Sequence, residues 1–259
     1  MQHFLQRVAR RAADFGIDVG RVRQSLSGLP RFIAEARAYQ RANRSGSFPL
    51  GLRDLRPALL DSNVAADAFD SHYFHQDLWA ARKIWSARPA HHVDVGSRLD
   101  GFVAHLLTFM PVTVLDVRPL SRPVQGLEFV LGDATDLSPF ADRSLESVSC
   151  LHALEHFGLG RYGDPIDPEA WSRSLAAFVR VLRPGGKLYL SVPVGRQRLE
   201  FNAHRVFAPD TILSALSELR LLSFAAVTDQ GMFQENAKPR DCSDACYACG
   251  MFELVKPQC

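Results

Sequence analysis

The chain has 259 residues, of which 47% are hydrophobic and 22% are charged, values typical of a soluble globular protein. A formal net charge of +2 argues against nucleic acid binding by bulk electrostatics, and no apolar run approaches the ~18 residues of a membrane span. Five cysteines, three of them within eight positions, make a poor disulfide framework. Together with a first segment that lacks the apolar core of a signal peptide, they predict a cytoplasmic protein.

Residues 1–88 are predicted to form a helical N-terminal extension. Apolar residues recur at helical spacing near its start, with arginines between them: Phe4, Leu5, Val8, Ala12 and Phe15. A basic amphipathic helix of this kind either packs on its own domain or contacts a membrane surface or a partner peripherally. Residues 41–51, RANRSGSFPLG, are typical of a loop.

A second helix is predicted over residues 72–85, HYFHQDLWAARKIW. Its expected buried face consists of Leu78, Ala81, Ile84 and Trp85. The aromatic and polar residues at its start either line a pocket or pack against the neighbouring domain: Tyr73, Phe74, His75 and Gln76.

From residue 89 to residue 259 the pattern changes to strands alternating with helices. The strand candidates are HHVDV, VTVLDV, LEFVL, SLESVSCL, KLYLSVP, LLSFAAV and ACGMFELV. A helix is predicted in PEAWSRSLAAFVRVLRPGG, where Trp171, Leu175, Phe178 and Leu182 share a face and the Pro-Gly-Gly run ends it. This alternation predicts an α/β domain: a three-layer, Rossmann-like, seven-stranded and mostly parallel sheet with helices on both faces.

Acidic residues and glycines follow three successive predicted strands. The first strand leads into Asp94, Gly96, Arg98 and Gly101, the second ends at Asp116, and the third is followed by Asp133 and Ala134. The three glycines of a dinucleotide fingerprint are not all present, so a pyrophosphate cradle is not expected. Each aspartate alone is typical of a turn or a helix cap, but three in register favour a nucleoside ligand.

These motifs carry a resemblance to a known superfamily. DVGSRLDG, then the acidic residue after strand two, GDA, LHALEH and LRPGGKLYLSVP together resemble a class I S-adenosylmethionine (SAM)-dependent methyltransferase over residues 88–256. HYFHQDLWAARKI, HVDVGSRLDGFVAHL, SCLHALEHFGLGRYGDPIDP and FNAHRVF further resemble a branch known only as a domain of unknown function, with a likeness reaching back to about Asp67.

The resemblance implies a role for each matching position. Asp94, Gly96 and Gly101 would face the methionine half of SAM, and Asp116 would hold the ribose hydroxyls. Asp133 and Ala134 would meet the adenine. Arg98 stands where the superfamily usually has a second glycine; a cation there either binds the SAM carboxylate, the reading we favour, or obstructs the cofactor.

Candidates for acid–base chemistry follow strands four and five. We expect His156 or His204 to act as the base, with Glu155 orienting or charging it. A purely structural Glu-His pair is the alternative, and a divalent cation held by Glu155, His156, Asp164 and Asp167 matches no strict template. The Gly- and Pro-rich loop at residues 157–168 is expected to close over the acceptor.

The sequence therefore predicts SAM-dependent methyl transfer, to an oxygen of a small molecule or glycan precursor. The first alternative is a non-catalytic protein of the same fold that binds a nucleoside ligand or a protein partner. The second is a nucleotide-sugar or dinucleotide enzyme, which the missing glycines disfavour.

The stretch CSDACYAC, from Cys242 to Cys249, has the C-x3-C-x2-C spacing that radical SAM enzymes use to hold an iron–sulfur cluster. We expect no cluster and no metal site here, because the last strand is predicted from about Cys246 to Val255. Residues three apart in a strand point to opposite faces. These cysteines are instead expected to pack as small buried hydrophobes.

Overall fold

The computed structural model divides into two compact units, residues 1–68 and residues 69–259, and each is described by itself. The structure describes residues 18–44, 48–60 and 68–258. The amphipathic segment expected between Phe4 and Phe15 lies outside these ranges. None of the helices in the described ranges combines the length and apolar character that crossing a bilayer requires.

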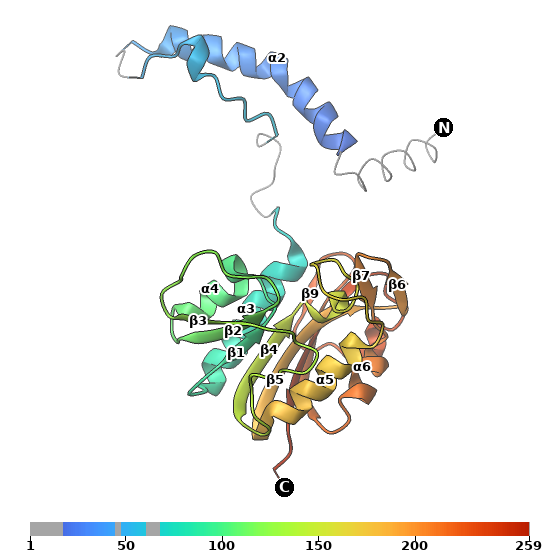
Figure 1. Ribbon diagram of the computed structural model, residues 1–259. Helices are drawn as coiled ribbons and strands as arrows, with labels where there is room; N and C mark the ends of the chain where they lie inside the picture. Colours follow the sequence, from blue (N-terminus) through green and yellow to red (C-terminus); the bar gives the residue numbers. More distant parts are fainter. Residues whose placement is uncertain (1–17, 45–47, 61–67, 259) are drawn as a thin grey trace. The chain divides into compact units, whose positions relative to one another are not determined.

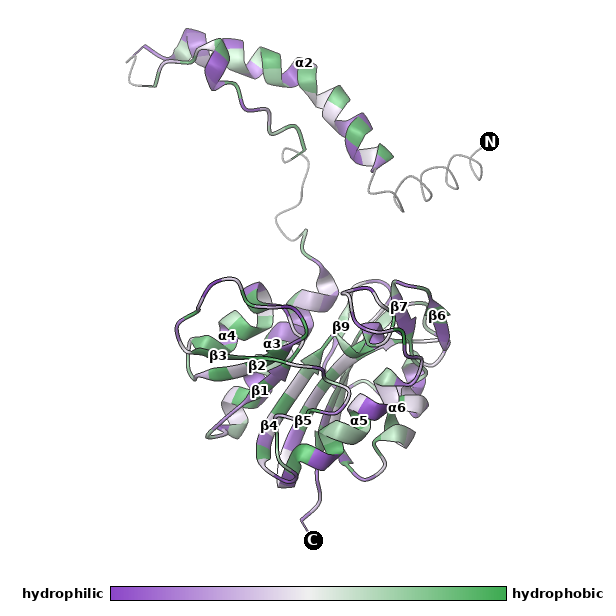
Figure 2. Ribbon diagram, in the orientation of Figure 1, coloured by the Kyte–Doolittle hydropathy of each residue, from purple (hydrophilic) through white to green (hydrophobic). Residues whose placement is uncertain are grey.

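The first unit contains a long helix, α2 (Val19–Ala42), and a short 3-10 helix, η1 (Leu52–Asp54). Asp18 caps α2 by accepting a hydrogen bond from the Arg21 backbone N–H at 2.9 Å. None of the described residues of α2 is buried, and hydrophobic and hydrophilic residues alternate along it in Figure 2. The predicted loop begins later than expected, because α2 continues through Ala42.

The second unit is built around an eight-stranded sheet in the order β3-β2-β1-β4-β5-β10-β8-β9 (Figure 1). Neighbours from β3 to β5 are parallel, whereas β10 runs antiparallel to both β5 and β8. The strands are β1 (Val93–Val95), β2 (Val112–Asp116), β3 (Leu127–Leu131), β4 (Leu145–Leu151), β5 (Leu182–Val194), β8 (Arg220–Val227), β9 (Phe233–Gln234) and β10 (Ala248–Val255). All seven predicted strands are present, and the two-residue β9 adds an edge.

The strand order reverses between β1 and β4, because β1 pairs with β2 on one side and with β4 on the other. Ligands of open α/β sheets bind at such a switch point, outside the carboxyl ends of the strands. A separate antiparallel ribbon of β6 (Arg198–Glu200) and β7 (His204–Val206) follows β5.

Helices cover both faces of the sheet, as Figure 1 shows. One core contains residues of α5 (Ala170–Val181) and α6 (Pro209–Ala215) packed against strand residues such as Leu190 and Phe252. The other contains residues of α3 (Ser71–Ala87), the π-helical turn η3 (Leu99–Val103) and α4 (Ala104–Leu107) packed against Tyr189 and Met251. Because side chains alternate along a strand, the central strands supply both cores. The three-layer architecture is confirmed.

Helix α3 belongs to the sheet unit rather than to the N-terminal extension. It contacts β10, β8 and β4, and its buried residues are Gln76, Asp77, Trp79, Ala80, Ala81 and Ile84. The boundary between the units therefore falls before α3, at residues 68 and 69, and not after it at residue 88. The predicted buried face is also rotated, since Trp85 is half exposed while Trp79 is buried.

The predicted face of α5 is confirmed, because Leu175 and Phe178 are fully buried and Trp171 packs against the same core. The helix ends at Val181, and β5 begins at Leu182. Pro184, Gly185 and Gly186 therefore lie within the first part of β5 rather than in a turn before it.

Candidate active site

A cleft of about 230 Å³ opens at the carboxyl ends of the parallel strands. Its walls come from the residues that follow β1, β2, β3 and β4, from Tyr73 of α3, and from the loop at residues 157–168. The predicted site residues that line it are Gly96, Arg98, Asp116, Asp133, Ala134 and His156, and His152 lines it as well. The structure thus brings the three strand-end segments to one place, as the register of the predicted strands required.

The loop after β1 leaves the floor of the cleft without a side chain. Gly96 has a φ of +73°, and a Cβ atom there would lie 3.1 Å from the Cβ of Ala153. A residue with a side chain would therefore be strained and crowded at this position. This open floor is a place where a ligand can approach the backbone.

Asp94 lies beneath the cleft and does not line it. Its carboxylate is fully buried and accepts hydrogen bonds from the Ser97 hydroxyl at 2.7 Å, the Ser97 backbone N–H at 3.1 Å and the Ser149 hydroxyl at 2.6 Å. Burial raises the pKa of Asp94 to about 6, although these donors oppose the shift. Asp94 shapes the loop that carries Gly96, which corrects the expectation that it faces the ligand directly.

Gly101 is also displaced from the cleft wall. A Cβ there would come within 2.4 Å of a carboxylate oxygen of Asp77, so the glycine allows η3 to pack against α3. Arg98 does line the cleft and is exposed. Its guanidinium forms a two-point ion pair with Asp100 and lies 5.0 Å from the centre of the Tyr73 ring.

Asp116 stands at the end of β2 as predicted, but its carboxylate already has a partner. Arg118 donates to it through Nε at 3.0 Å and through Nη2 at 2.7 Å, and the Arg118 backbone N–H donates at 2.8 Å. The same guanidinium lies 4.8 Å from the centre of the Tyr162 ring. Sequence reasoning missed Arg118, which follows the acidic residue by two positions.

Asp133 and Ala134 form the wall that follows β3. Asp133 is exposed and its Oδ1 accepts a hydrogen bond from the Thr135 backbone N–H at 2.8 Å, while Ala134 is buried. Both residues line the cleft, and their predicted contact with adenine stays a prediction.

The loop at residues 157–168 borders the cleft and is held by one of its own aspartates. Asp164 accepts hydrogen bonds from the backbone N–H groups of Gly158, Gly160 and Tyr162, at 2.8, 3.3 and 3.2 Å. The Arg205 side chain donates to the backbone carbonyl of Phe157 at 2.6 Å. Asp164 therefore fixes the loop conformation, and its carboxylate is not free for an acceptor or a cation.

Two polar groups follow β4 in a buried ion pair. His152 has a positive φ of 47°, and its Nδ1 lies 2.7 Å from Oε1 of Glu155. Burial alone would lower the pKa of His152, but the Glu155 carboxylate and the neighbouring Cys249 side chain together outweigh it and raise that pKa well above 6.5. The pKa of Glu155 is lowered, because the charge of His152 outweighs the effect of burial.

His156 lies on the 3-10 helix η4 (Leu154–His156) and lines the cleft. Its Nδ1 lies 2.7 Å from the backbone carbonyl of Ala203, which makes Nδ1 the donor and leaves the lone pair on Nε2. Nε2 is 3.7 Å from Oε1 of Glu155. Burial lowers the pKa of His156, so the ring is neutral at pH 7.

His204, the other predicted base, lies on β7 and does not line the cleft. Its Nε2 is 3.5 Å from a Glu200 carboxylate oxygen, and its ring packs 4.9 Å from that of Tyr247, measured between centroids. Of the two predicted histidines, His156 therefore lines the cleft and His204 lies outside it.

The three clustered cysteines do not converge. Cys242 is buried on the 3-10 helix η5 (Pro239–Cys242), Cys246 is exposed before β10, and Cys249 is buried within β10. The strand begins at Ala248, two residues later than the expected start at about Cys246. Cys249 instead meets His72 and His152, and these three residues are called the His–Cys cluster below.

Of the aromatic and polar residues at the start of α3, Tyr73 lines the cleft and Gln76 is buried, whereas Phe74 is exposed. The sequence predicted that this segment lines a pocket or packs against the neighbouring domain, but no pattern in it indicated that His72 would lie beside a histidine and a cysteine. Those residues lie far along the chain.

Comparison with known proteins agrees with this architecture. The model of a family described as "Caenorhabditis protein of unknown function, DUF268" matches residues 134–225. No curated protein sequence matches the chain. Among solved structures, the N-methyltransferase NodS from Bradyrhizobium japonicum WM9, in complex with S-adenosyl-L-homocysteine, is 15% identical with a TM-score of 0.50, and the match covers 71% of this chain and 87% of that one.

A second solved structure, from Galdieria sulphuraria and described as a sarcosine dimethylglycine methyltransferase, is 12% identical with a TM-score of 0.50. It covers 71% of this chain and 86% of that one. At this identity the likeness concerns the fold. The resemblance inferred from the sequence is confirmed at that level: the chain has the class I SAM-dependent methyltransferase fold and, over residues 134–225, the pattern of a family of unknown function.

Proposed function

We propose that the protein transfers a methyl group from SAM to an oxygen of a small molecule or glycan precursor. The observation that carries this proposal is the shared cleft. One end is lined by Gly96, Asp116 and Asp133, a set suited to a nucleoside, and the other end presents the neutral imidazole of His156. When bound, SAM supplies a methyl group on a positively charged sulfur, and its displacement leaves S-adenosylhomocysteine.

The residues of the cleft fit a nucleoside cofactor, with one rearrangement. Gly96 leaves room at the backbone, and the Asp133 and Ala134 segment forms an opposite wall. Asp116 can accept both hydroxyls of a ribose once Arg118 releases its carboxylate oxygens. Arg118 is half exposed and can turn toward solvent, whereas the Asp116 side chain is only 12% exposed and needs the ribose hydroxyls in place of the guanidinium.

His156 is the group best placed to accept the proton of a hydroxyl acceptor. Hydrogen bonding of Nδ1 to Ala203 fixes the tautomer in which Nε2 accepts a proton. The imidazolium formed in this way would be stabilised by Glu155 Oε1, 3.7 Å from Nε2. His152 is unsuited to the role, because its raised pKa keeps it protonated and paired with Glu155.

Isothermal titration with SAM and S-adenosylhomocysteine tests the cofactor, with NAD and a uridine nucleotide sugar as comparison ligands. We expect both SAM and its product to bind, and the other two not to bind. Absence of any response to SAM and its product would make the proposal wrong.

The base is tested in an assay that follows transfer of a labelled methyl group to a library of hydroxyl-bearing small molecules. H156Q is expected to lower kcat by roughly 10²–10⁴-fold while the affinity for S-adenosylhomocysteine stays unchanged. H204Q is the matched control, since His204 lies outside the cleft. Equal losses in both variants would contradict the assignment of His156.

One observation favours a second candidate, a non-catalytic protein of this fold. The Asp116 carboxylate is occupied by Arg118, as it would be if the ribose site had been closed. The variant R118A separates the two. Binding of SAM only after this substitution would support the non-catalytic candidate, whereas binding by the unaltered chain supports the methyltransferase.

A further inference from the structure

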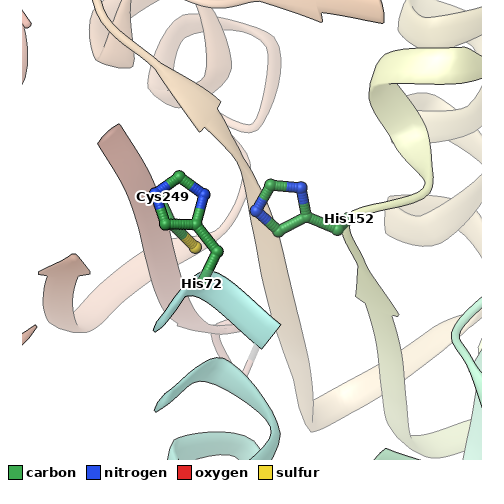
Figure 3. A group of neighbouring side chains, drawn as sticks. All are labelled: His72, His152 and Cys249. Carbon is green, nitrogen blue, oxygen red and sulfur yellow. The ribbon is translucent and has the colours of Figure 1, made fainter. Parts of the chain in front are cut away.

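The His–Cys cluster gathers three potential metal ligands from distant parts of the sheet unit. His72 lies on the first turn of α3, His152 follows β4, and Cys249 lies in β10. A ligand atom from each, a ring nitrogen or the sulfur, lies within 4.8 Å of the others. In Figure 3 the two imidazole rings and the sulfur face a common space.

The three residues are held there by the fold. Asp70 caps α3 and accepts a hydrogen bond from the His72 backbone N–H at 3.0 Å, and the Ser71 hydroxyl donates to the carbonyl of Gly231 at 2.6 Å. Cys249 pairs with Pro193 of β5 on one side and with Val227 of β8 on the other. Its position is therefore fixed by strands on both sides.

An independent observation points to a missing partner. The side chain of His152 is 3% exposed, and its Nε2 has no hydrogen-bond partner in the described part of the chain. Nδ1 of the same ring is bound to Glu155, so the free atom is the one turned toward His72 and Cys249. An unsatisfied buried polar atom destabilises the folded chain unless a ligand satisfies it.

We propose that His72, His152 and Cys249 bind a zinc-type divalent cation, with Glu155 supporting His152 and the fourth coordination position open. The cation takes the place of the Nε2 proton of His152 and of the thiol proton of Cys249, and both protons are released to solvent. Zinc binds both histidine nitrogen and cysteine sulfur, and its catalytic sites have three protein ligands with the fourth position open. A carboxylate on the second nitrogen of a ligating histidine, here at 2.7 Å, is the usual support for such a ligand.

The cluster has to contract slightly to hold the cation. Bond lengths of about 2.0–2.3 Å place two nitrogens and one sulfur around tetrahedral zinc roughly 3.3–3.6 Å apart, so a closing movement of up to about 1.5 Å is required. His72 can supply this movement, since it is half-buried on the first turn of α3 while the other two residues are buried.

The open position would face the candidate active site. His152 lines the cleft, and the rings of Tyr73 and Tyr247 border the cluster, at 5.4 Å from His152 and 5.5 Å from His72 respectively. A cation there would hold a water molecule or an oxygen of the acceptor and lower its pKa. This role toward the acceptor rests on the proposed function, whereas metal binding itself does not.

The test uses the full chain, reduced, freed of metal with a chelator, and titrated with Co²⁺ and then with Zn²⁺. We expect one ion per chain, the intense visible bands of tetrahedral Co²⁺, and a near-ultraviolet thiolate-to-cobalt charge-transfer band. Zn²⁺ should bleach these signals by displacement. C249S should lose the charge-transfer band, and H152N should lose the tetrahedral spectrum.

The matched control is C246S, since Cys246 is exposed and outside the cluster, and it should keep the full spectrum. E155Q should bind the ion roughly 10–100-fold more weakly. Circular dichroism checks that each variant is folded, and H72N, at a half-buried position, repeats the test if H152N does not fold.

Failure of the reduced chain to bind Co²⁺ or Zn²⁺ would overturn the proposal. So would binding that C249S, H72N and H152N leave unchanged. Titration with S-adenosylhomocysteine in the presence of chelator keeps this outcome separate from the proposed function, because the cofactor residues lie at the other end of the cleft. An ion that binds to a chain unable to bind S-adenosylhomocysteine would support the metal site alone.

Discussion

The two ends of the candidate active site are built on different principles. Over β1, β2 and β3, called the exposed end below because its arginines are exposed, carboxylates pair with arginines two positions away in sequence, as in the pairs Arg98–Asp100 and Asp116–Arg118. Over β4, β5 and β10 they are buried histidines, a glutamate and a cysteine from distant segments. The first end can therefore rearrange around a ligand through its exposed arginines, whereas in the second end His152 and Cys249 are buried and the movement falls to the half-buried His72.

The largest loss of stability is expected from removing one partner of the ion pair between Glu155 and His152, in the part of the site called the buried end. Glu155→Ala leaves the charge of His152 without its partner in a buried site, and we expect the free energy of unfolding to fall by about 3–5 kcal/mol. Urea denaturation in the presence of a chelator measures this change. Asp133→Ala, at the exposed end, is the matched control and should change it by less than about 0.5 kcal/mol. A similar fall in the free energy of unfolding of both variants would contradict the difference between the buried end and the exposed end.

At the exposed end we expect a substitution to lower the affinity for a ligand more than it lowers stability, the reverse of Glu155→Ala. Asp116→Asn removes the charge that would accept the ribose hydroxyls, so affinity for S-adenosylhomocysteine should fall by about 1.5–3 kcal/mol, roughly 10–100-fold. The free energy of unfolding should change by less than about 1 kcal/mol, because asparagine keeps an acceptor oxygen for Arg118 and water reaches the half-exposed guanidinium. Calorimetric titration of the variant measures its affinity for S-adenosylhomocysteine, and urea denaturation measures its free energy of unfolding. A stability loss without an affinity loss would refute the role of Asp116.

A buried histidine beneath the exposed end makes the free energy of unfolding depend on pH. His92 is fully buried between the Ser147 and Ser149 hydroxyls, and burial lowers its pKa from 6.5 to about 3. Below pH 6.5 the unfolded chain binds a proton that the folded chain does not. Stability should therefore fall as the pH falls from 6.5 toward 3, by up to about 1.4 kcal/mol per pH unit.

H92Q removes this contribution, because glutamine does not titrate and can still bond both serines. Asp94 acts in the opposite direction between about pH 6 and pH 4, since its pKa is raised, so the variant has to be compared with the parent chain. Urea denaturation at pH 7 and pH 5.5 should show a smaller loss of stability for H92Q. Equal losses in both proteins would contradict the prediction.

The smallest effect is expected from a substitution in the loop at residues 157–168, which borders the cleft. Asp164→Ala removes an acceptor from three backbone N–H groups, so amide hydrogen exchange in residues 157–168 should accelerate by roughly tenfold. Affinity for S-adenosylhomocysteine should stay nearly intact while turnover falls. A parallel loss of both would show that the loop serves cofactor binding rather than closure over the acceptor.

The exposed end could be predicted from the sequence because its residues follow strands directly. Once DVG, VLDV and GDA are assigned to successive parallel strands, the topology alone brings Gly96, Asp116 and Asp133 together. The partners of these residues were not predictable, because the ion pair of Asp116 with Arg118 depends on side-chain direction rather than on strand position.

The buried end could not be predicted in the same way. The spacing of Cys242, Cys246 and Cys249 suggested that the three cysteines be considered together, whereas the folded chain separates them. Cys249 meets histidines 97 and 177 positions away in the numbering of the chain, at His152 and His72. Only the insertion of β10 between β5 and β8, and the docking of α3 across them, brings the three residues together.

The position of β10 also gives an order to events during synthesis. This strand is the last of the sheet to leave the ribosome, yet it lies between β5 and β8, which are made before it. Until residues 248–255 emerge, β5 and β8 each lack a neighbour and His72 and His152 have no thiol to face. A nascent chain therefore acquires its sulfur ligand only in the step that closes its sheet, so that an incompletely folded chain offers no complete His–Cys cluster to capture a metal ion.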